Sequence, residues 1–287
     1  MARAAANVSR LQLAMRIPKR NLSRTDTEDL TVTDMCALSA DEVLLECDNA
    51  GLRTVSLHTA QLAAQEPTAI PHVLQVAFDA HTDTLLLLVR APTGGYSQLV
   101  SLRRNAREWL EVQRLDTRIR HDKLYSNLAV CDSRVLLGGG HLTLYVFDVS
   151  ADHTLRDAGS VTLQLGWSNV ACTRRDGVTL VAIQNSTSVL LLRLTSLPLH
   201  LVPLASVSLS YPIRFLFRED LLLVVDLNFV TLTEEIVSFR ASDNALTERR
   251  VLLDAQARVI VYAWALAGDR LVLWDNNSKD LRVYAFT

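Results

Sequence analysis

Short apolar runs separated by turn-forming residues recur along the whole chain. The C-terminal stretch YAWALAGDRLVLWDNNSKDLRVYAFT (262–287) holds three such runs, broken at Gly268-Asp269 and again at Asp275 and the two asparagines that follow it. Runs of this length, punctuated by Gly, Asp and Asn, are typical of consecutive antiparallel strands. The pattern therefore predicts a chain built from repeats of a strand–turn–strand unit.

The most regular run is the second strand of each unit, which recurs six times. Its copies are EVLLEC (42–47), TLLLLV (84–89), RVLLGG (134–139), VTLVAI (178–183), LLLVVD (221–226) and RLVLWD (270–275). Their starts lie 42 to 50 residues apart, a spacing typical of the blades of a β-propeller. A first strand precedes each copy and a third follows it. In three third strands the triplets VSL (55–57), VSL (100–102) and VSF (237–239) indicate equivalent positions.

A more polar fourth strand completes most units, with candidates at 110–115, 159–165, 201–209 and 246–253 and a weaker one at 63–70. The sixth unit ends after its third strand, so we expect residues 10–17 (RLQLAMRI) to supply the missing strand. Closing the ring with both chain ends leaves no long unpaired edge. The predicted fold is one all-β domain over 1–287, a six-bladed β-propeller with blades at about 32–70, 73–115, 126–165, 168–209, 213–253 and 259–287.

This arrangement resembles the WD40 repeat propellers. Phe147-Asp148 ends a third strand, where those repeats carry Trp-Asp. The Gly-His pair that such repeats carry before the first strand is absent from every copy, so the resemblance covers architecture. It implies a scaffold for protein partners and transfers no catalytic residue.

Composition narrows the function classes. The chain has 29 basic and 31 acidic residues, and this balance does not favour nucleic acid, which is bound by a dense positive surface. The apolar segment 188–210 is interrupted by Arg193 and Pro198, so no membrane span is predicted. Four cysteines without a CxxC pair favour a reducing compartment, and we expect the cytoplasm. No nucleophile elbow, phosphate loop or dinucleotide motif occurs, and neither a catalytic residue nor a cofactor is predicted.

The position just before the apolar run of each first strand carries a polar or bulky residue. The first strands of a propeller line its central channel, so these six positions should form a ring at the channel mouth. They are Asp34, Gln75, Asn127, Asn169, Arg214 and Tyr262. Solvated channel walls are one interpretation. The other is a site for a small ligand or for Ca²⁺, which oxygen ligands bind; the ring loosely resembles the metal site of lactonase-like propellers. One acid and one arginine in the ring count against a metal.

The loops that lead into the first strands carry a second set of equivalent residues, which should gather on one face. They are His72, Tyr125, Trp167, Tyr211 and Arg258. Tyr, Trp and Arg are enriched at binding hot spots, although rings wedged between blades are the simpler interpretation. The nearby basic loop 114–123 suggests an acidic partner.

The leading hypothesis is a non-enzymatic scaffold that binds a protein or peptide on this face. Its alternative is a channel-centred Ca²⁺-dependent hydrolase or small-ligand binder. Membership of a larger complex is a third possibility.

Overall fold

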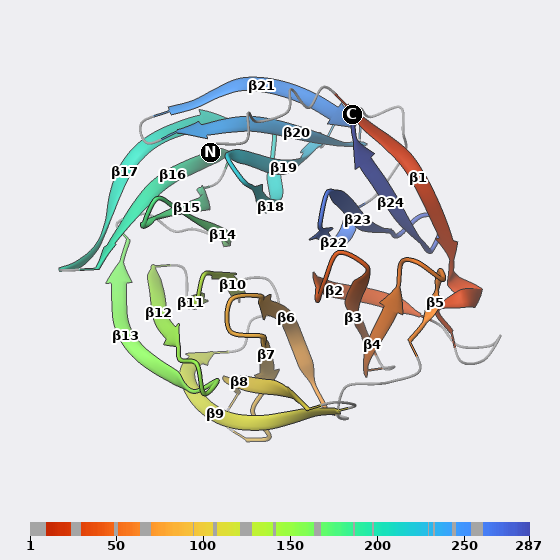
Figure 1. Cartoon of the computed structure of the whole chain (residues 1–287). Helices are drawn as coiled ribbons and strands as arrows, with labels where there is room; N and C mark the ends of the chain where they lie inside the picture. The colour runs from red at the N-terminus through yellow and green to blue at the C-terminus, as the bar shows by residue number, and fades with distance from the viewer. Residues whose placement is uncertain are drawn as a thin grey trace.

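The chain folds into a ring of β-sheets around a central channel (Figure 1). The computed structural model describes residues 10–23, 30–48, 51–63, 70–93, 95–105, 108–120, 128–139, 142–163, 168–185, 187–196, 198–228, 230–231, 233–242, 245–253 and 261–287. Within these ranges the only helical segment is the single turn η1 (Lys19–Asn21), and the strands form six four-stranded sheets. The predicted six-bladed propeller is confirmed.

Each blade is an antiparallel sheet whose first strand lines the channel. The strands of blades 1 to 5 follow chain order outward, and in blade 6 the outermost strand comes from the N-terminus. The strands of the first three blades are β2 (Thr31–Ala37), β3 (Glu42–Asp48), β4 (Gly51–Ser56) and β5 (Gln61–Leu62); β6 (Val73–Asp79), β7 (Thr84–Arg90), β8 (Tyr96–Asn105) and β9 (Glu108–Arg120); β10 (Leu128–Cys131), β11 (Arg134–Gly139), β12 (Thr143–Val149) and β13 (Leu155–Thr162). Those of the last three are β14 (Ser168–Arg175), β15 (Val178–Asn185), β16 (Ser188–Ser196) and β17 (Leu199–Ser208); β18 (Pro212–Arg218), β19 (Leu221–Asn228), β20 (Thr233–Ser242) and β21 (Ala245–Leu253); β22 (Val261–Ala267), β23 (Arg270–Asp275), β24 (Asp280–Phe286) and β1 (Leu11–Pro18).

The N-terminal strand closes the ring, as the sequence predicts. Strand β1 is the outer strand of blade 6 and pairs with β24 along its length, with Leu11 opposite Phe286 and Pro18 opposite Asp280. The ladder extends by backbone hydrogen bonds in both directions between Arg10 and Thr287. The side chain of Ile17 is fully buried in the cluster that joins blade 6 to blade 1. Both chain ends therefore hold the same sheet.

The second strands form the core because the blades pack face to face. Leu85, Leu86, Leu87 and Leu88 of β7 are all fully buried, alternating between clusters shared with blade 1 and blade 3. A strand covered on both faces has no solvent side, and this explains why these copies read as continuous apolar runs instead of alternating ones.

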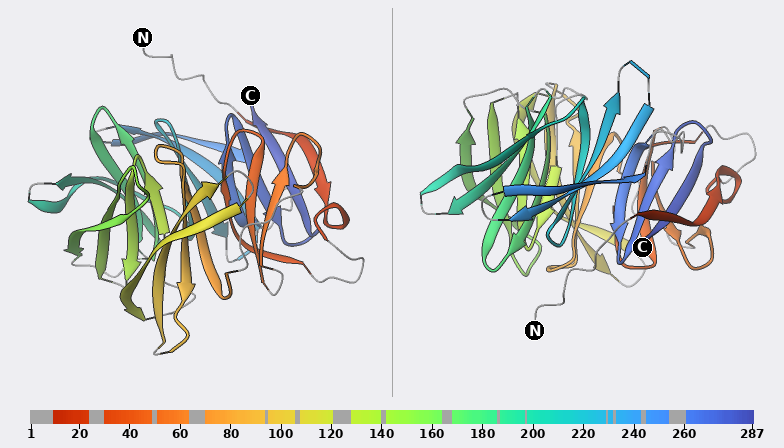
Figure 2. Two further views of the ribbon diagram at one scale, coloured as in Figure 1. Left: turned by 60° about the horizontal axis from the view of Figure 1, so that its bottom comes forward. Right: turned by 90° about the horizontal axis from the view of Figure 1, so that it is seen from above.

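The two ends of the channel differ in the segments they carry. All first strands run in the same direction, so the connections between blades and the turns between second and third strands lie at one end, here called the loop face. The turns after the first and third strands lie at the other end, here called the turn face. The chain ends near the turn face, and the β19–β20 hairpin stands out from the loop face (Figure 2).

One repeat is aligned differently from what the triplets indicate. Val100 lies opposite Leu87 and Val237 opposite Val224, which are equivalent positions. Val55 instead lies opposite Val43, two residues nearer the start of the second strand. Because side chains alternate with period two, a shift of two residues keeps the same face buried, so the pattern could not reveal it.

The fourth strand of blade 1 is the shortest. The structure places it at Gln61–Leu62, whereas residues 63–70 were expected; of those, 64–69 lie outside the described residues. The other four fourth strands overlap their predicted positions, and β9 continues to residue 120.

Deleting residues 1–17 should destabilise the whole ring. It removes β1, exposes the edge of β24 and uncovers the cluster around Ile17. We expect a large fall in melting temperature and aggregation through the exposed edge. Deleting only residues 1–9, which leaves β1 intact, is the control. Thermal denaturation and size-exclusion chromatography measure both, and a 1–17 deletion that melts like the control as a monomer would show that β1 is dispensable.

Phe239→Ala should be among the most costly core substitutions. The ring is 1% exposed and packs with Leu222 and Phe215 between blades 4 and 5. Removing a buried aromatic side chain costs about 3–5 kcal/mol in the free energy of unfolding. Val251→Ala, on the outer strand of the same blade and 38% exposed, should cost about 0.5 kcal/mol or less. Urea denaturation compares them, and equal losses would contradict the assigned core.

Candidate functional site

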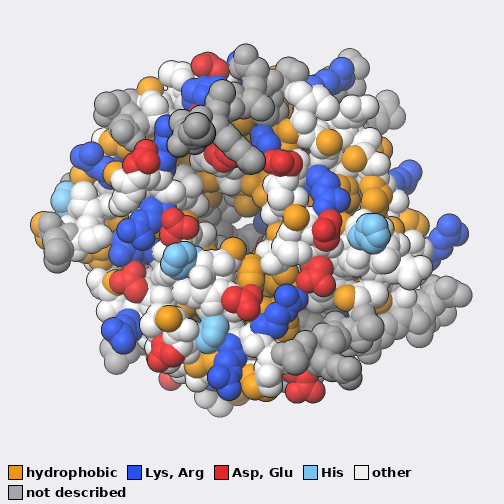
Figure 3. Space-filling view, in the orientation of Figure 1, with side chains coloured by type: hydrophobic (Ala, Val, Ile, Leu, Met, Phe, Trp, Pro, Cys, Tyr) orange, Lys and Arg blue, Asp and Glu red, His pale blue; other side chains and the backbone are white. Residues whose placement is uncertain are grey.

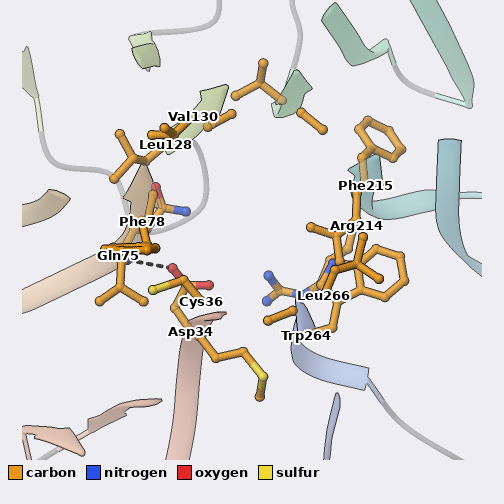
Figure 4. A pocket seen from close by; sticks show the side chains of 18 of the residues that line it. Asp34, Cys36, Gln75, Phe78, Leu128, Val130, Arg214, Phe215, Trp264 and Leu266 are labelled. Atoms are coloured by element: carbon orange, nitrogen blue, oxygen red, sulfur yellow. Dashed lines mark hydrogen bonds between the residues drawn. The ribbon is translucent and has the colours of Figure 1, made fainter. Parts of the chain in front are cut away.

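A cavity of about 300 Å³ occupies the channel between the six first strands (Figure 4). Its wall includes residues from β2, β6, β10, β14, β18 and β22, so every blade contributes. Most of the residues that line the cavity are apolar, among them Phe78, Phe215 and Trp264. Four of the lining residues are polar: Asp34, Gln75, Asn169 and Arg214.

β-bulges in the first strands place these polar residues. Five of the six first strands shift register by one residue near their start, between Val32/Asp34, Val73/Gln75, Ser168/Val170, Pro212/Arg214 and Val261/Ala263. A bulge bends its strand and re-aims nearby side chains. Because the shifts recur close to the loop face, the regular pairing of first and second strands is interrupted around that end of the channel.

The structure brings four of the six predicted ring residues onto one cavity wall. Asp34, Gln75 and Arg214 each follow the extra residue of a bulge, whereas Asn169 is itself an extra residue. Asn169 adopts a φ of 35°, a backbone region that asparagine tolerates better than most residues, and its amide donates to Gln184 Oε1 at 2.6 Å. Asn127 lies outside the described residues, as does the side chain of Tyr262.

Asp34 joins blade 1 to blade 2. Its Oδ2 accepts a hydrogen bond from the backbone N–H of Val76 at 2.8 Å. Burial in the channel wall raises the pKa of Asp34 to about 6, although the hydrogen bonds from Val76 and Met35 and the charge of Arg214 lower it. The carboxyl is ionised at neutral pH, in surroundings that compensate its charge incompletely.

Glu234 makes the same kind of contact between blades 5 and 6. Its Oε2 accepts a hydrogen bond from the backbone N–H of Val261 at 2.6 Å. Burial raises the pKa of Glu234 to about 7, with Val261 and Arg214 acting in the opposite direction and Asp275 adding to the rise. The positive charge of Arg214 thus lowers the pKa of both carboxyls.

Gln75 lines the cavity, and its side-chain oxygen accepts no hydrogen bond from the described residues. Its Oε1 is buried and has no hydrogen-bond donor among the described residues. Figure 4 shows Gln75 beside Asp34 on one side of the cavity, with the Arg214 guanidinium directed toward them from the other side. A buried acceptor that receives no hydrogen bond is costly to the folded state.

Two of the five predicted loop residues are described, and both lie on the loop face. Their carbonyl oxygens accept equivalent hydrogen bonds, His72 from Arg90 N–H and Tyr211 from Leu227 N–H, both at 3.0 Å. Asp226 holds the Tyr211 backbone through a further hydrogen bond at 2.7 Å. They belong to blades 2 and 5, across the channel from each other (Figure 1), so they share a face without forming a cluster. Tyr125, Trp167 and Arg258 lie outside the described residues.

The sequence interpretation missed three apolar residues on the same face. Tyr96, Leu142 and Val230 are 40%, 43% and 94% exposed, and each lies where a second strand turns into a third. They could have been found in the sequence as apolar residues within turn segments, in TGGY, GGHL and NFVT. Apolar side chains in turns cannot reach the core, and this marks them as surface features.

The expected basic loop 114–123 is in large part a strand. Residues up to Arg120 belong to β9, and the Arg114 guanidinium forms an ion pair with Glu111 at 2.7 Å and donates to Gln98. Residues 121–123 lie outside the described residues. Part of the positive charge that suggested an acidic partner is therefore neutralised within the sheet.

The described part of the chain offers little support for a metal site or for a membrane-spanning helix. No three His, Cys, Asp or Glu side chains gather there as a metal site would require, and Asp34 is the only acid among the residues of the cavity wall that the structure describes. None of the helical structure described in the chain is long and apolar enough to cross a membrane.

Comparison with known proteins places the fold and leaves the activity open. No family model and no curated protein matches the sequence. A functionally unknown protein from Desulfotomaculum acetoxidans has a similar structure, with TM-score 0.63 and 15% identity over 91% of this chain and 84% of that one. The Swd1 β-propeller domain of Myceliophteria thermophila (TM-score 0.55, 12% identity, 90% and 83% covered) and the WD40 repeats of RRP9 (0.55, 10%, 96% and 100%) also match. The chain thus shares the β-propeller fold of WD40 repeat domains.

Asp34→Asn should change how stability depends on pH. The folded-state pKa of about 6 lies above the ordinary value of 3.8, so the folded protein binds the proton more tightly and stability falls as pH rises between these values. Asn cannot ionise, so it removes this fall. Between pH 4 and pH 8 we expect Asp34 to cost wild type roughly 1–3 kcal/mol in the free energy of unfolding, a loss that the variant should not show.

Urea denaturation between pH 4 and pH 8 measures this difference. Glu234 contributes a fall of the same sign, but it is present in both proteins and cancels. Asp176→Asn, whose side chain is 91% exposed on the turn face, is the control and should follow wild type. Parallel curves for wild type and Asp34→Asn would contradict the burial of an ionised Asp34.

Proposed function

We propose that this chain is a non-enzymatic interaction module that captures a protein or peptide on its loop face. The observation that carries the proposal is the distribution of exposed apolar side chains. Six large ones are exposed in the described residues, and four of them lie at the loop face: Tyr96, Leu142, Tyr211 and Val230. The other two, Leu13 and Val251, lie on outer strands.

The turn face has a different chemistry. Charged side chains of both signs surround the channel there (Figure 3). Several pair across blade boundaries: Arg218 with Asp269 at 3.0 Å and Arg270 with Asp41 at 2.8 Å. These pairs connect blade 5 to blade 6 and blade 6 to blade 1. Charges that pair within the ring support its structure, whereas apolar side chains exposed to solvent support docking of a partner.

Exposed aromatic and aliphatic side chains are suitable binding anchors. A Tyr side chain offers a large contact area with few rotatable bonds and a hydroxyl that forms hydrogen bonds. The exposed residues span blades 2, 3 and 5, so they can hold an extended segment or a folded domain across the channel mouth. Tyr125, Trp167 and Arg258 remain predictions for the same surface.

The calcium-dependent hydrolase is the weaker candidate. Hard cations are held by several oxygen ligands, usually with more than one carboxylate. Among the described residues of the cavity wall Asp34 is the one acid, and Arg214 faces it. The four cysteines are free thiols, in keeping with a cytoplasmic location, which we propose together with the scaffold role. Leu13 and Val251 would be the rim contacts if the module belongs to a larger complex.

Partner capture should depend on the loop face and not on the turn face. We expect Tyr96→Ala/Tyr211→Ala/Val230→Ser to weaken binding by roughly 30-fold or more, because interface anchors commonly contribute at least about 2 kcal/mol. The three side chains are exposed, so the variant should melt like wild type. Affinity capture from native extract, with quantitative mass spectrometry of the retained proteins, measures the loss.

The matched control changes three exposed turn-face residues, in the variant His58→Ala/Arg175→Ala/Asp176→Ala. It should retain the same proteins as wild type. Retention by the loop-face variant, or loss by the control alone, would refute the proposed surface. A Trp167→Ala variant tests the predicted anchor outside the described residues.

A further inference from the structure

Two cysteines face each other across the interface between blades 3 and 4. On β10, Cys131 packs against the cluster between these blades, whereas its neighbour Val130 packs against the cluster between blades 2 and 3. On β14, Cys172 belongs to the same cluster that Cys131 contacts, whereas its neighbour Ala171 belongs to the cluster between blades 4 and 5. Side chains alternate along a strand, and in these two strands the alternation directs both sulfurs into one interface.

The two thiols are in contact. They share a hydrogen bond, and this bond together with burial raises the pKa of the Cys172 thiol well above its ordinary value. The charge of Arg134 acts in the opposite direction. Cys172 is therefore a protonated thiol at neutral pH, held beside Cys131 in an apolar environment.

We propose that Cys131 and Cys172 form a redox modification site, a dithiol that a peroxide converts to a disulfide between blades 3 and 4. A disulfide forms only where the two sulfurs already lie close together, and the shared interface places them so. Strands β10 and β14 belong to different sheets, so the bond would join two blades covalently. This site is independent of partner docking on the loop face.

Cys131 is the thiol that an oxidant should reach first. It ends β10 at the turn face and is half-buried, whereas Cys172 lies within β14 and is 9% exposed. The three residues that follow Cys131 line a cavity of about 290 Å³ on the turn face. This cavity can admit a small oxidant such as hydrogen peroxide to the end of β10. Cys172, the more buried of the two, would then act as the second thiol.

The reaction proceeds in two steps. The Cys131 thiolate attacks one oxygen of hydrogen peroxide, so that an S–O bond forms and the O–O bond breaks. The departing hydroxide takes up the proton that the Cys131 thiol released, and the products are a sulfenic acid and water. The Cys172 sulfur then attacks the sulfenic sulfur, so that an S–S bond forms and the S–O bond breaks. The second hydroxide leaves as water with the Cys172 proton.

Overall, two thiols and one peroxide give one disulfide and two water molecules. The two sulfurs together lose two electrons, and the peroxide gains them. Because Cys172 already shares a hydrogen bond with Cys131, it should trap the sulfenic acid before a second peroxide oxidises it further.

The test is peptide mapping of the full chain after treatment with hydrogen peroxide. Folded and fully reduced protein is oxidised, its remaining thiols are blocked with N-ethylmaleimide in urea, and it is digested without reductant for mass spectrometry. We expect the Cys131–Cys172 peptide pair to exceed any other cysteine pair roughly tenfold or more. Dithiothreitol should restore both thiols. Cys36 and Cys47, which belong to two clusters with one cysteine each, should be recovered with the blocking group.

Alanine variants separate the roles of the two thiols, since alanine keeps the interface apolar. With Cys172→Ala, the oxidation of Cys131 should stop at a sulfenic acid that dimedone labels. With Cys131→Ala, Cys172 should stay reduced. Cys47→Ala is the matched control and should form the disulfide like wild type.

Three results would overturn the site, and all three come from wild type, so they do not depend on the folding of a variant. They are the absence of the linked pair after peroxide treatment of the folded chain, its formation only in urea, and equal amounts of pairs that include Cys36 or Cys47. Dimedone labelling of Cys131 in wild type that equals the labelling in Cys172→Ala would also contradict the proposal, because Cys172 would then not act as the second thiol.

Discussion

Backbone pairing between the two ends of the chain is the interaction on which the rest of the structure depends. Six blades bury their faces against one another only if the last blade meets the first, and β1 completes that last blade against β24. The buried Ile17 and the ion pair between Arg16 and Asp280 fix the register of this strand. Because the channel is the space that six converging first strands enclose, its cavity exists only in the closed ring.

Closure also gives the ring two chemically different ends. The antiparallel order sends every connection between blades to the loop face, where apolar turn residues remain exposed. The turn face carries short polar turns, and its charges pair between blades. The bulged starts of the first strands lie near the loop face and bring a carboxyl, two amides and a guanidinium into the channel wall. Fold and candidate site thus follow from the same strand order.

Much of this architecture could be predicted because it is repeated. Six copies of a buried second strand gave the number of blades, and the absence of a fourth strand after 286 predicted the closing role of the N-terminus. The register of Val55 could not be predicted, since a two-residue shift preserves the alternation of faces. Ring positions such as Asp34 were visible as polar letters before apolar runs. Their convergence, the bulges and the unsatisfied oxygen of Gln75 arise from contacts between blades, which no single repeat encodes.

The central claim is that the six converging first strands bury the carboxyl of Asp34 in the channel wall. The most direct measurement is a ¹³C NMR titration of the Asp34 carboxyl carbon. The account predicts a midpoint near pH 6, because burial disfavours the ionised form of a carboxyl. A midpoint near the ordinary value of 3.8 would contradict it.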